Sequence, residues 1–167
     1  MRCLLASAVA VALAGLAPEA HAQKPLIGAF VEGGSGLEIG GGNGLLLAQR
    51  ARTQLHLGAV IRDSEMPADA IIGAVVVELE PVPSIGADLQ WAHRLGPLWF
   101  QAGIAAIIAP QSMFGPTAGA RLQVKLGPLF SLTAGPQVSC FPIGSDVPDK
   151  SIVFQGLLMV GIHADLF

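Results

Sequence analysis

The sequence predicts an all-β fold: an eight-stranded antiparallel up-and-down transmembrane barrel, preceded by a cleavable signal peptide. Three observations lead to this prediction. The chain begins with a short apolar segment that has the features of an export signal, its composition is more apolar than that of an ordinary water-soluble domain, and the rest of its length alternates between apolar and polar residues in eight segments. Alternation with a period of two is typical of strands that have one apolar face.

Residues 1–22 have the features of a secretory signal peptide. Arg2 gives a positive start, residues 4–16 form a mostly apolar segment, and Ala-His-Ala at 20–22 places small residues before a cleavage site. The apolar segment is too short to cross a bilayer as a helix, which separates it from a membrane anchor. We therefore expect a signal peptide over 1–22 and a β-barrel domain over 23–167.

The composition favours a membrane protein made of strands. Hydrophobic residues make up 52% of the chain and charged residues only 13%, whereas a soluble domain has about 25% charged residues. The longest uncharged stretch of the mature region, 95–120, contains three prolines, and each would break or kink a helix. Only helices and closed barrels satisfy every backbone group in lipid, so an apolar exported chain without a spanning helix indicates a barrel.

Charge and cysteine content exclude several other classes. The net charge of −3 is unchanged when the signal peptide is removed, because that segment carries one arginine and one glutamate. This balance does not favour a nucleic-acid partner. Cys140 is the only cysteine left, so we expect an unpaired thiol. His56, His93 and His163 lie on separate segments without the spacing of metal ligands; we expect no metal and no cofactor.

Four expected strands lie in the first half of the mature region. They cover 27–39, 45–62, 71–80 and 85–93, and their odd positions are mainly apolar. We expect these odd residues to form one face of each strand. The even positions carry the charged residues: Glu32 and Glu38, then Arg50, Arg52 and Arg62, then Glu78 and Glu80, then Asp88.

Four more expected strands cover 98–106, 118–126, 130–134 and 154–166, where the apolar face falls on even positions. Their polar faces carry Gln101, then Arg121, Gln123 and Lys125, then Ser131 and Thr133, then Gln155, His163 and Asp165. The total of eight strands is the smallest common count for a transmembrane barrel, and tilted strands of about 9–11 residues cross a bilayer.

The connections between these segments suggest two different rims. The Leu-Gly-Pro-Leu sequences at 95–98 and 126–129 are expected to be tight turns on one rim, because they follow strands that lie two apart. Longer links are expected around 109–117 and 141–151 on the opposite rim. Short turns on one side and long loops on the other are typical of outer-membrane barrels.

Over the whole mature region this pattern resembles the small eight-stranded outer-membrane barrels of Gram-negative bacteria, the class that includes the OmpA transmembrane domain and OmpX. The resemblance is one of architecture and involves no diagnostic motif. It implies an outer-membrane location, contact with outer-membrane lipids, and a structural or interaction role with at most a very small pore. Members of the class end in an aromatic residue that the barrel-assembly machinery reads, and Phe167 matches. No feature of the sequence identifies a loop-binding partner.

Alternation alone does not say which face is outside. With the apolar face inward, the chain would be a soluble periplasmic carrier of an apolar ligand, similar to a lipocalin. The polar face is rich in Gly, Ala, Gln and Ser, which fit a narrow interior, and has few of the Lys and Glu residues that solubilise an outer surface. This favours the membrane barrel, with the soluble carrier as the alternative.

The polar face predicts a cluster of charges in the lumen. A turn near Gly42 would place Glu32 opposite Arg52, and pairing of the next two strands would bring Glu80 to the same arginine. Because an unpaired buried charge is costly, we expect a cluster of Glu32, Arg52 and Glu80 that closes the barrel. The remaining charges are expected near it (Arg50, Arg62, Glu38 and Glu78) or across the lumen (Asp88, Arg121 and Lys125). A charged constriction for a small solute is the functional alternative.

Three residues of the last two expected strands suggest a third possible function, lipid hydrolysis. Pairing of the last two strands would set Ser131 opposite His163, with Asp165 two residues further on. A nucleophile, a base and an orienting acid are the residue types of acyl transfer, as in an outer-membrane lipid hydrolase. No Gly-x-Ser-x-Gly motif surrounds the serine. We therefore expect these residues to make interior hydrogen bonds and the protein not to be an enzyme.

Overall fold

The computed structural model describes residues 26–42, 45–80, 82–147 and 151–166, without the side chains of 42–48. The signal peptide expected at 1–22 and the terminal Phe167 lie outside the described residues. The strands are β1 (Leu26–Gly42), β2 (Leu45–Arg62), β3 (Asp69–Glu80), β4 (Ser84–Leu95), β5 (Leu98–Ala109), β6 (Met113–Lys125), β7 (Phe130–Phe141), β8 (Ile143–Gly144) and β9 (Ile152–Asp165). Among the described residues, no helix is long and apolar enough to cross a membrane.

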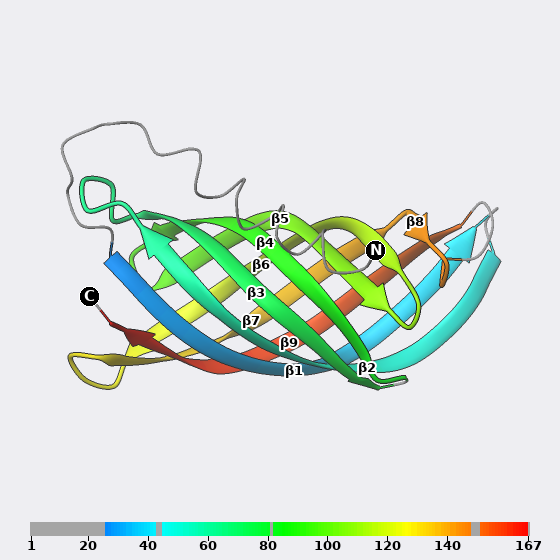
Figure 1. The fold of residues 1–167 in the computed structure, drawn as a ribbon, viewed down its shortest axis with the longest axis horizontal. Helices are drawn as coiled ribbons and strands as arrows, with labels where there is room; N and C mark the ends of the chain where they lie inside the picture. The colour runs from blue at the N-terminus through cyan, green and yellow to red at the C-terminus, as the bar shows by residue number, and fades with distance from the viewer. Residues whose placement is uncertain (1–25, 43–44, 81, 148–150, 167) are drawn as a thin grey trace, which may run out of the picture.

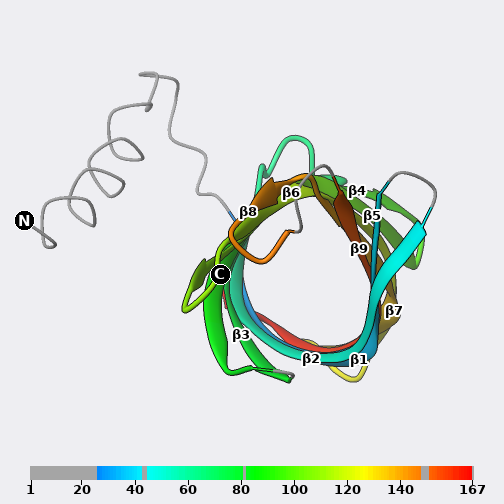
Figure 2. The same ribbon diagram turned by 90° about the vertical axis from the view of Figure 1, so that its right-hand side faces the viewer.

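Eight of these strands form a closed antiparallel wall. Each pairs with the next in the chain from β1 to β7, β7 pairs with β9, and β9 pairs with β1. The short β8 pairs only with the start of β6, within the described residues. The strands run obliquely to the long axis of the molecule (Figure 1) and form a ring when viewed from its end (Figure 2). The predicted eight-stranded up-and-down barrel is confirmed.

The predicted rim asymmetry is wrong in its main part. The expected long link at 109–117 is reduced to 110–112, because β6 already begins at Met113 and pairs there with Ile107 of β5. On the opposite rim, the link 63–68 is longer than this one. Only 142–151 remains a long connection, and it contains β8. The physical reason is that pairing continues through 113–117, Pro116 included, because the ladder satisfies the other backbone groups there.

Burial follows the predicted alternation along the wall. The apolar face points outward: Val31, Leu89 and Leu158 are 49%, 51% and 62% exposed. The polar face lines the lumen, where Glu32 and Arg121 are 4% and 2% exposed. The alternative with an apolar interior, a lipocalin-like carrier, is therefore wrong for this structure.

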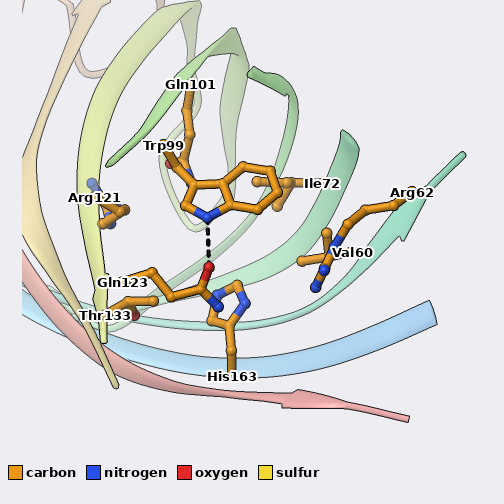
Figure 3. Close-up of a pocket in the computed structure, with 9 residues that line it drawn as sticks. All are labelled: Val60, Arg62, Ile72, Trp99, Gln101, Arg121, Gln123, Thr133 and His163. Atoms are coloured by element: carbon orange, nitrogen blue, oxygen red, sulfur yellow. Dashed lines mark hydrogen bonds between the residues drawn. The ribbon is translucent and has the colours of Figure 1, made fainter. Parts of the chain in front are cut away.

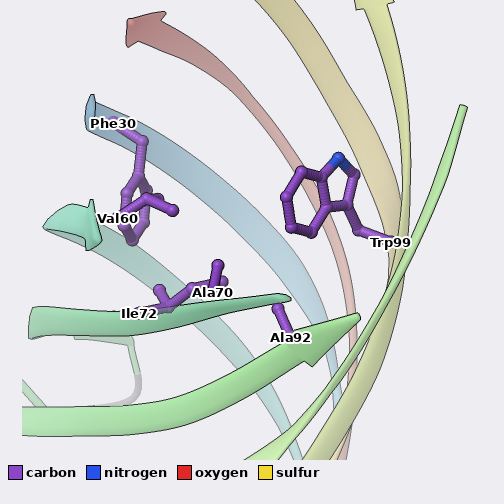
Figure 4. Packing of buried hydrophobic residues seen from close by; sticks show 6 residues of the cluster. All are labelled: Phe30, Val60, Ala70, Ile72, Ala92 and Trp99. Carbon is purple, nitrogen blue, oxygen red and sulfur yellow. The ribbon is translucent and has the colours of Figure 1, made fainter. Parts of the chain in front are cut away.

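The lumen also contains apolar side chains that the alternation had not assigned to it. One cluster near the 96–97 turn consists of Phe30, Val60, Ala70, Ile72, Ala92 and Trp99 (Figure 4). A second cluster near the 110–112 link consists of Val76, Ala105, Ile107, Met113, Phe141 and Val153. Both clusters pack inside the ring. The buried charges therefore lie in a lumen that apolar packing fills at both ends.

Gly36 of β1 lies where two neighbouring strands of the wall approach each other closely. A Cβ added at Gly36 would overlap the backbone carbonyl of Gly156 in β9, which is held in the ladder and has no room to move. We expect Gly36→Ala to lower the free energy of unfolding by about 1–3 kcal/mol, measured as the melting temperature in detergent. Gly73→Ala is the matched control, since a Cβ there meets no atom within 4 Å. Equal melting temperatures for the two variants would contradict this packing.

Candidate functional site

The first group of buried charges surrounds Arg52 and is here called the Arg52 cluster. The Arg52 guanidinium donates from Nε to Glu38 Oε2 at 2.7 Å and from Nη1 to Glu78 Oε2 at 2.8 Å. Its Nη2 also reaches Asp146 Oδ2 at 3.2 Å. Gln54 donates to Glu78 Oε1 at 2.9 Å, and Gln155 donates to Glu38 Oε2 at 3.1 Å. The guanidinium is thus held by carboxylates from three parts of the chain.

A carboxylate, Arg52, carboxylate cluster was predicted, but with the wrong carboxylates. Arg52 pairs in register with Gly36, and Glu32 lies opposite His56, because β1 runs to Gly42 and β2 begins at Leu45, which places the centre of the hairpin beyond Gly42. Displacing the centre of a hairpin changes every cross-strand partner. Glu38, which lies six residues closer to the hairpin on the same face of β1, takes the place predicted for Glu32.

Glu80 is also not part of the cluster. A register shift between Thr53 and Gln54 places Glu80 opposite Thr53, whose hydroxyl donates to Glu80 Oε2 at 3.4 Å on the exposed side. Such a bulge puts one residue of a strand out of phase with its neighbours. Glu78, which stays in phase, enters the lumen and bonds Arg52 instead.

The second group surrounds Arg121 and is here called the Arg121 cluster. Arg121 Nε donates to Glu32 Oε2 at 3.1 Å across the lumen, and its Nη2 donates to Gln137 Oε1 at 2.7 Å. The Thr133 hydroxyl donates to Glu32 Oε1 at 2.8 Å. Arg121 therefore occupies the predicted side of the lumen, but its carboxylate partner is Glu32, the residue that had been assigned to Arg52.

The other predicted charges lie at the edges of these clusters. Arg50, 36% exposed at its side chain, is 3.8 Å from Glu38 Oε1 and 3.5 Å from Asp146 Oδ2. Arg62 pairs with Asp165 at the opposite end of the barrel. Lys125 is exposed at the end of β6, so its predicted place in the lumen is wrong.

Several members of the clusters were not predicted to belong to them. Gln155 was expected on a polar face but not beside a charge, and Gln54 and Gln137 also lie on inward positions, where polar alternation was the available signal. Asp146 lies on the 142–151 link, where no periodicity indicates direction. Its approach to Arg52 depends on how that link folds over the end of the barrel.

The three residues considered for lipid hydrolysis are only partly brought together. Ser131 does lie opposite His163 in the β7–β9 ladder, as predicted. Asp165, however, pairs with Arg62, while the His163 ring stacks on Phe30 and lies 3.8 Å from Glu32 Oε1. No hydrogen bond joins Ser131 to His163 among the described residues. The arrangement therefore lacks the serine, histidine, aspartate relay that activates a nucleophile.

Two cavities inside the lumen are small. The one in Figure 3 lies between Arg62, Trp99, Gln123 and His163, and the Trp99 indole donates to Gln123 Oε1 at 2.5 Å across it. Its volume is about 10 Å³, which is the space of about one water molecule. Side chains therefore fill the lumen at this level.

The Arg52 cluster predicts a large loss of stability when its cation is removed. Arg52→Met leaves Glu38 and Glu78 buried without their partner, and removing one member of a buried ion pair costs about 3–5 kcal/mol. We expect a clearly lower melting temperature in detergent, with part of the loss restored in Arg52→Met combined with Glu78→Gln. Arg50→Met is the control, since a half-exposed ion pair contributes less than about 1 kcal/mol. An unchanged melting temperature for Arg52→Met would show that the cluster does not stabilise the barrel.

Comparison with solved structures finds barrels of the same architecture. The outer membrane protein AlkL, determined by solid-state NMR in DMPC lipid bilayers, is 14% identical; the match covers 90% of this chain and 95% of that chain, with a TM-score of 0.53. Neisserial surface protein A is also 14% identical; that match covers 83% of this chain and 97% of that chain, with a TM-score of 0.50. No protein-family model matches this sequence, and neither does any curated protein. The chain thus has the fold of the small eight-stranded outer-membrane β-barrels.

Proposed function

We propose that this protein is an outer-membrane β-barrel with a structural or interaction role and a lumen closed by internal ion pairs. The observation that carries the proposal is the distribution of side chains: apolar residues face outward on the wall strands, while the charges of the Arg52 and Arg121 clusters are buried inside. An outer surface of this kind is stable against lipid chains and poorly suited to water.

The closed lumen supports a structural or interaction role over that of a wide pore. An eight-stranded barrel has an interior just wide enough for side chains to fill. Here two apolar clusters pack inside the ring, and the buried side chains of the Arg52 and Arg121 clusters occupy further space in the lumen. At most a very small pore is compatible with this filling, and the charged constriction for a small solute is less well supported.

The proposed function also includes a route to the outer membrane. The signal peptide at 1–22 would direct the chain out of the cytoplasm, and the barrel-assembly machinery would read Phe167 and insert the strands into the outer membrane. Outer-membrane lipids would then be the main contacts of the outward face. AlkL, which has the same fold, was studied in lipid bilayers, and this supports a membrane location for the present chain.

If the barrel spans a membrane, the effect of a charged substitution on the outward face should depend strongly on its depth in the bilayer. Leu89 lies in the middle of β4 and is 51% exposed, and an arginine at the bilayer midplane costs about 2–4 kcal/mol. We expect Leu89→Arg to reduce the amount of folded protein in the outer-membrane fraction. Leu126→Arg, at a 64% exposed position beyond the end of β6, is the control that inserts normally. Release of the unmodified protein by osmotic shock, with Leu89→Arg equally well folded, would contradict the proposal and favour a periplasmic protein.

The closed lumen makes a second prediction, about conductance. In planar bilayers we expect the purified barrel to show no steady open-channel current, because side chains block the lumen at several levels. A wide porin, reconstituted in the same way, serves as the positive control. A stable current proportional to voltage would contradict the closed lumen and favour the small-solute constriction.

A further inference from the structure

A second lumen cavity lies between the Arg121 cluster and β4. It has a volume of about 10 Å³ and is lined in part by His56, Asp88 and Gln90. This is the space of about one water molecule. Asp88 and Gln90 are 6% and 5% exposed, so bulk water does not solvate them freely.

Two buried oxygen atoms beside this cavity lack a hydrogen-bond donor. Gln90 Nε2 donates to Asp88 Oδ2 at 2.5 Å. The remaining oxygens, Asp88 Oδ1 and Gln90 Oε1, are buried and have no hydrogen-bond partner. Since a buried polar atom without a partner is costly, each unsatisfied group needs an explanation such as a bound molecule or ion.

His56 adds a third acceptor. The Gln54 amide nitrogen donates to Glu78 and Gln155, so its oxygen faces His56 Nε2 at 3.2 Å. His56 Nε2 must therefore carry the hydrogen, which makes Nδ1 the acceptor in the neutral ring. Nδ1 lies 3.9 Å from Asp88 Oδ2, so two acceptors face each other across a short gap.

The charge around the cavity is also unbalanced. Among the described residues, Asp88 has no arginine or lysine within ion-pair distance, and Arg121 directs its Nε to Glu32. The ionisable groups that line the cavity come from four other strands: Glu32 of β1, His56 of β2, Arg121 of β6 and His163 of β9. When both imidazoles are neutral, the carboxylates of Asp88 and Glu32 have a single positive group beside the cavity, the guanidinium of Arg121. A buried carboxylate without a counter-charge is strongly unfavourable.

We propose that this cavity is a binding site for one water-sized positive charge beside Asp88, held by Asp88 Oδ1, Gln90 Oε1 and His56 Nδ1. A proton, taken up by the Asp88 carboxylate or by the imidazole, and a monovalent metal ion would each supply this charge. The site goes beyond the proposed function and rests on the lumen geometry, whichever membrane or compartment contains the barrel.

The test compares the native chain with Asp88→Asn, which keeps the side-chain shape, removes the charge and supplies an N–H donor. Melting temperatures are measured in detergent in choline chloride at pH 8, in sodium chloride at pH 8 and in choline chloride at pH 5.5, all at one ionic strength. We expect the variant to be the more stable protein in choline chloride at pH 8. The difference in melting temperature between the variant and the native chain should decrease by about 3 °C or more when a suitable cation fills the native site.

The two sources of charge give different patterns. Loss of the advantage in sodium chloride at pH 8 identifies a monovalent metal ion, and loss only at pH 5.5 identifies a proton. Glu80→Gln, which removes an exposed carboxylate, is the control and should follow the native chain. Gln90→Leu removes one acceptor, so it should weaken the response to cation even if Asp88→Asn fails to fold. A constant difference between Asp88→Asn and the native chain in all three solutions, or an unaltered response of Gln90→Leu, would overturn the site.

Discussion

The pairing of β1 with β9 is the interaction on which the rest of the structure depends. It joins the first and last strands over Gly28 to Gly41 and closes the wall. Without it, β1 and β9 would each expose an unpaired edge, which lipid does not tolerate. Closure also creates the two surfaces of the molecule, because the residues of each strand must face either the ring's interior or its surroundings. Small residues such as Gly36 allow the two strands to approach closely at this seam.

Closure then determines how the buried charges are arranged. Glu32 and Arg121 lie on β1 and β6, on opposite walls, and meet only because the ring brings them together. Arg52, Glu38 and Glu78 come from neighbouring strands, so their contacts depend on register. Both guanidinium groups are fully engaged. Asp88 is the exception, a carboxylate without a strong cationic partner among the described residues, and this makes it the most informative residue of the lumen.

A filled lumen and an apolar outer wall are the two features that support the proposed structural or interaction role. The wall interacts with its surroundings through exposed aliphatic and aromatic side chains, and the interior is occupied by ion pairs, glutamines and two apolar clusters. In such a barrel the interior contributes to stability and can hold a small ion.

The sequence by itself determined the number of wall strands, the approximate bounds of most of them and which residues share a face, because these properties follow from local alternation. β7 is the exception in its bounds, since it extends to Phe141 and the alternation predicted only 130–134. Val31, Leu89 and Leu158 face outward as the pattern predicted. Only the tertiary structure decided which charges meet. The position of the first turn and the bulge between Thr53 and Gln54 replaced Glu32 and Glu80 by Glu38 and Glu78 as partners of Arg52. Register depends on small displacements at turns and bulges, and contacts across a lumen depend on ring closure; neither leaves a periodic signal in the chain.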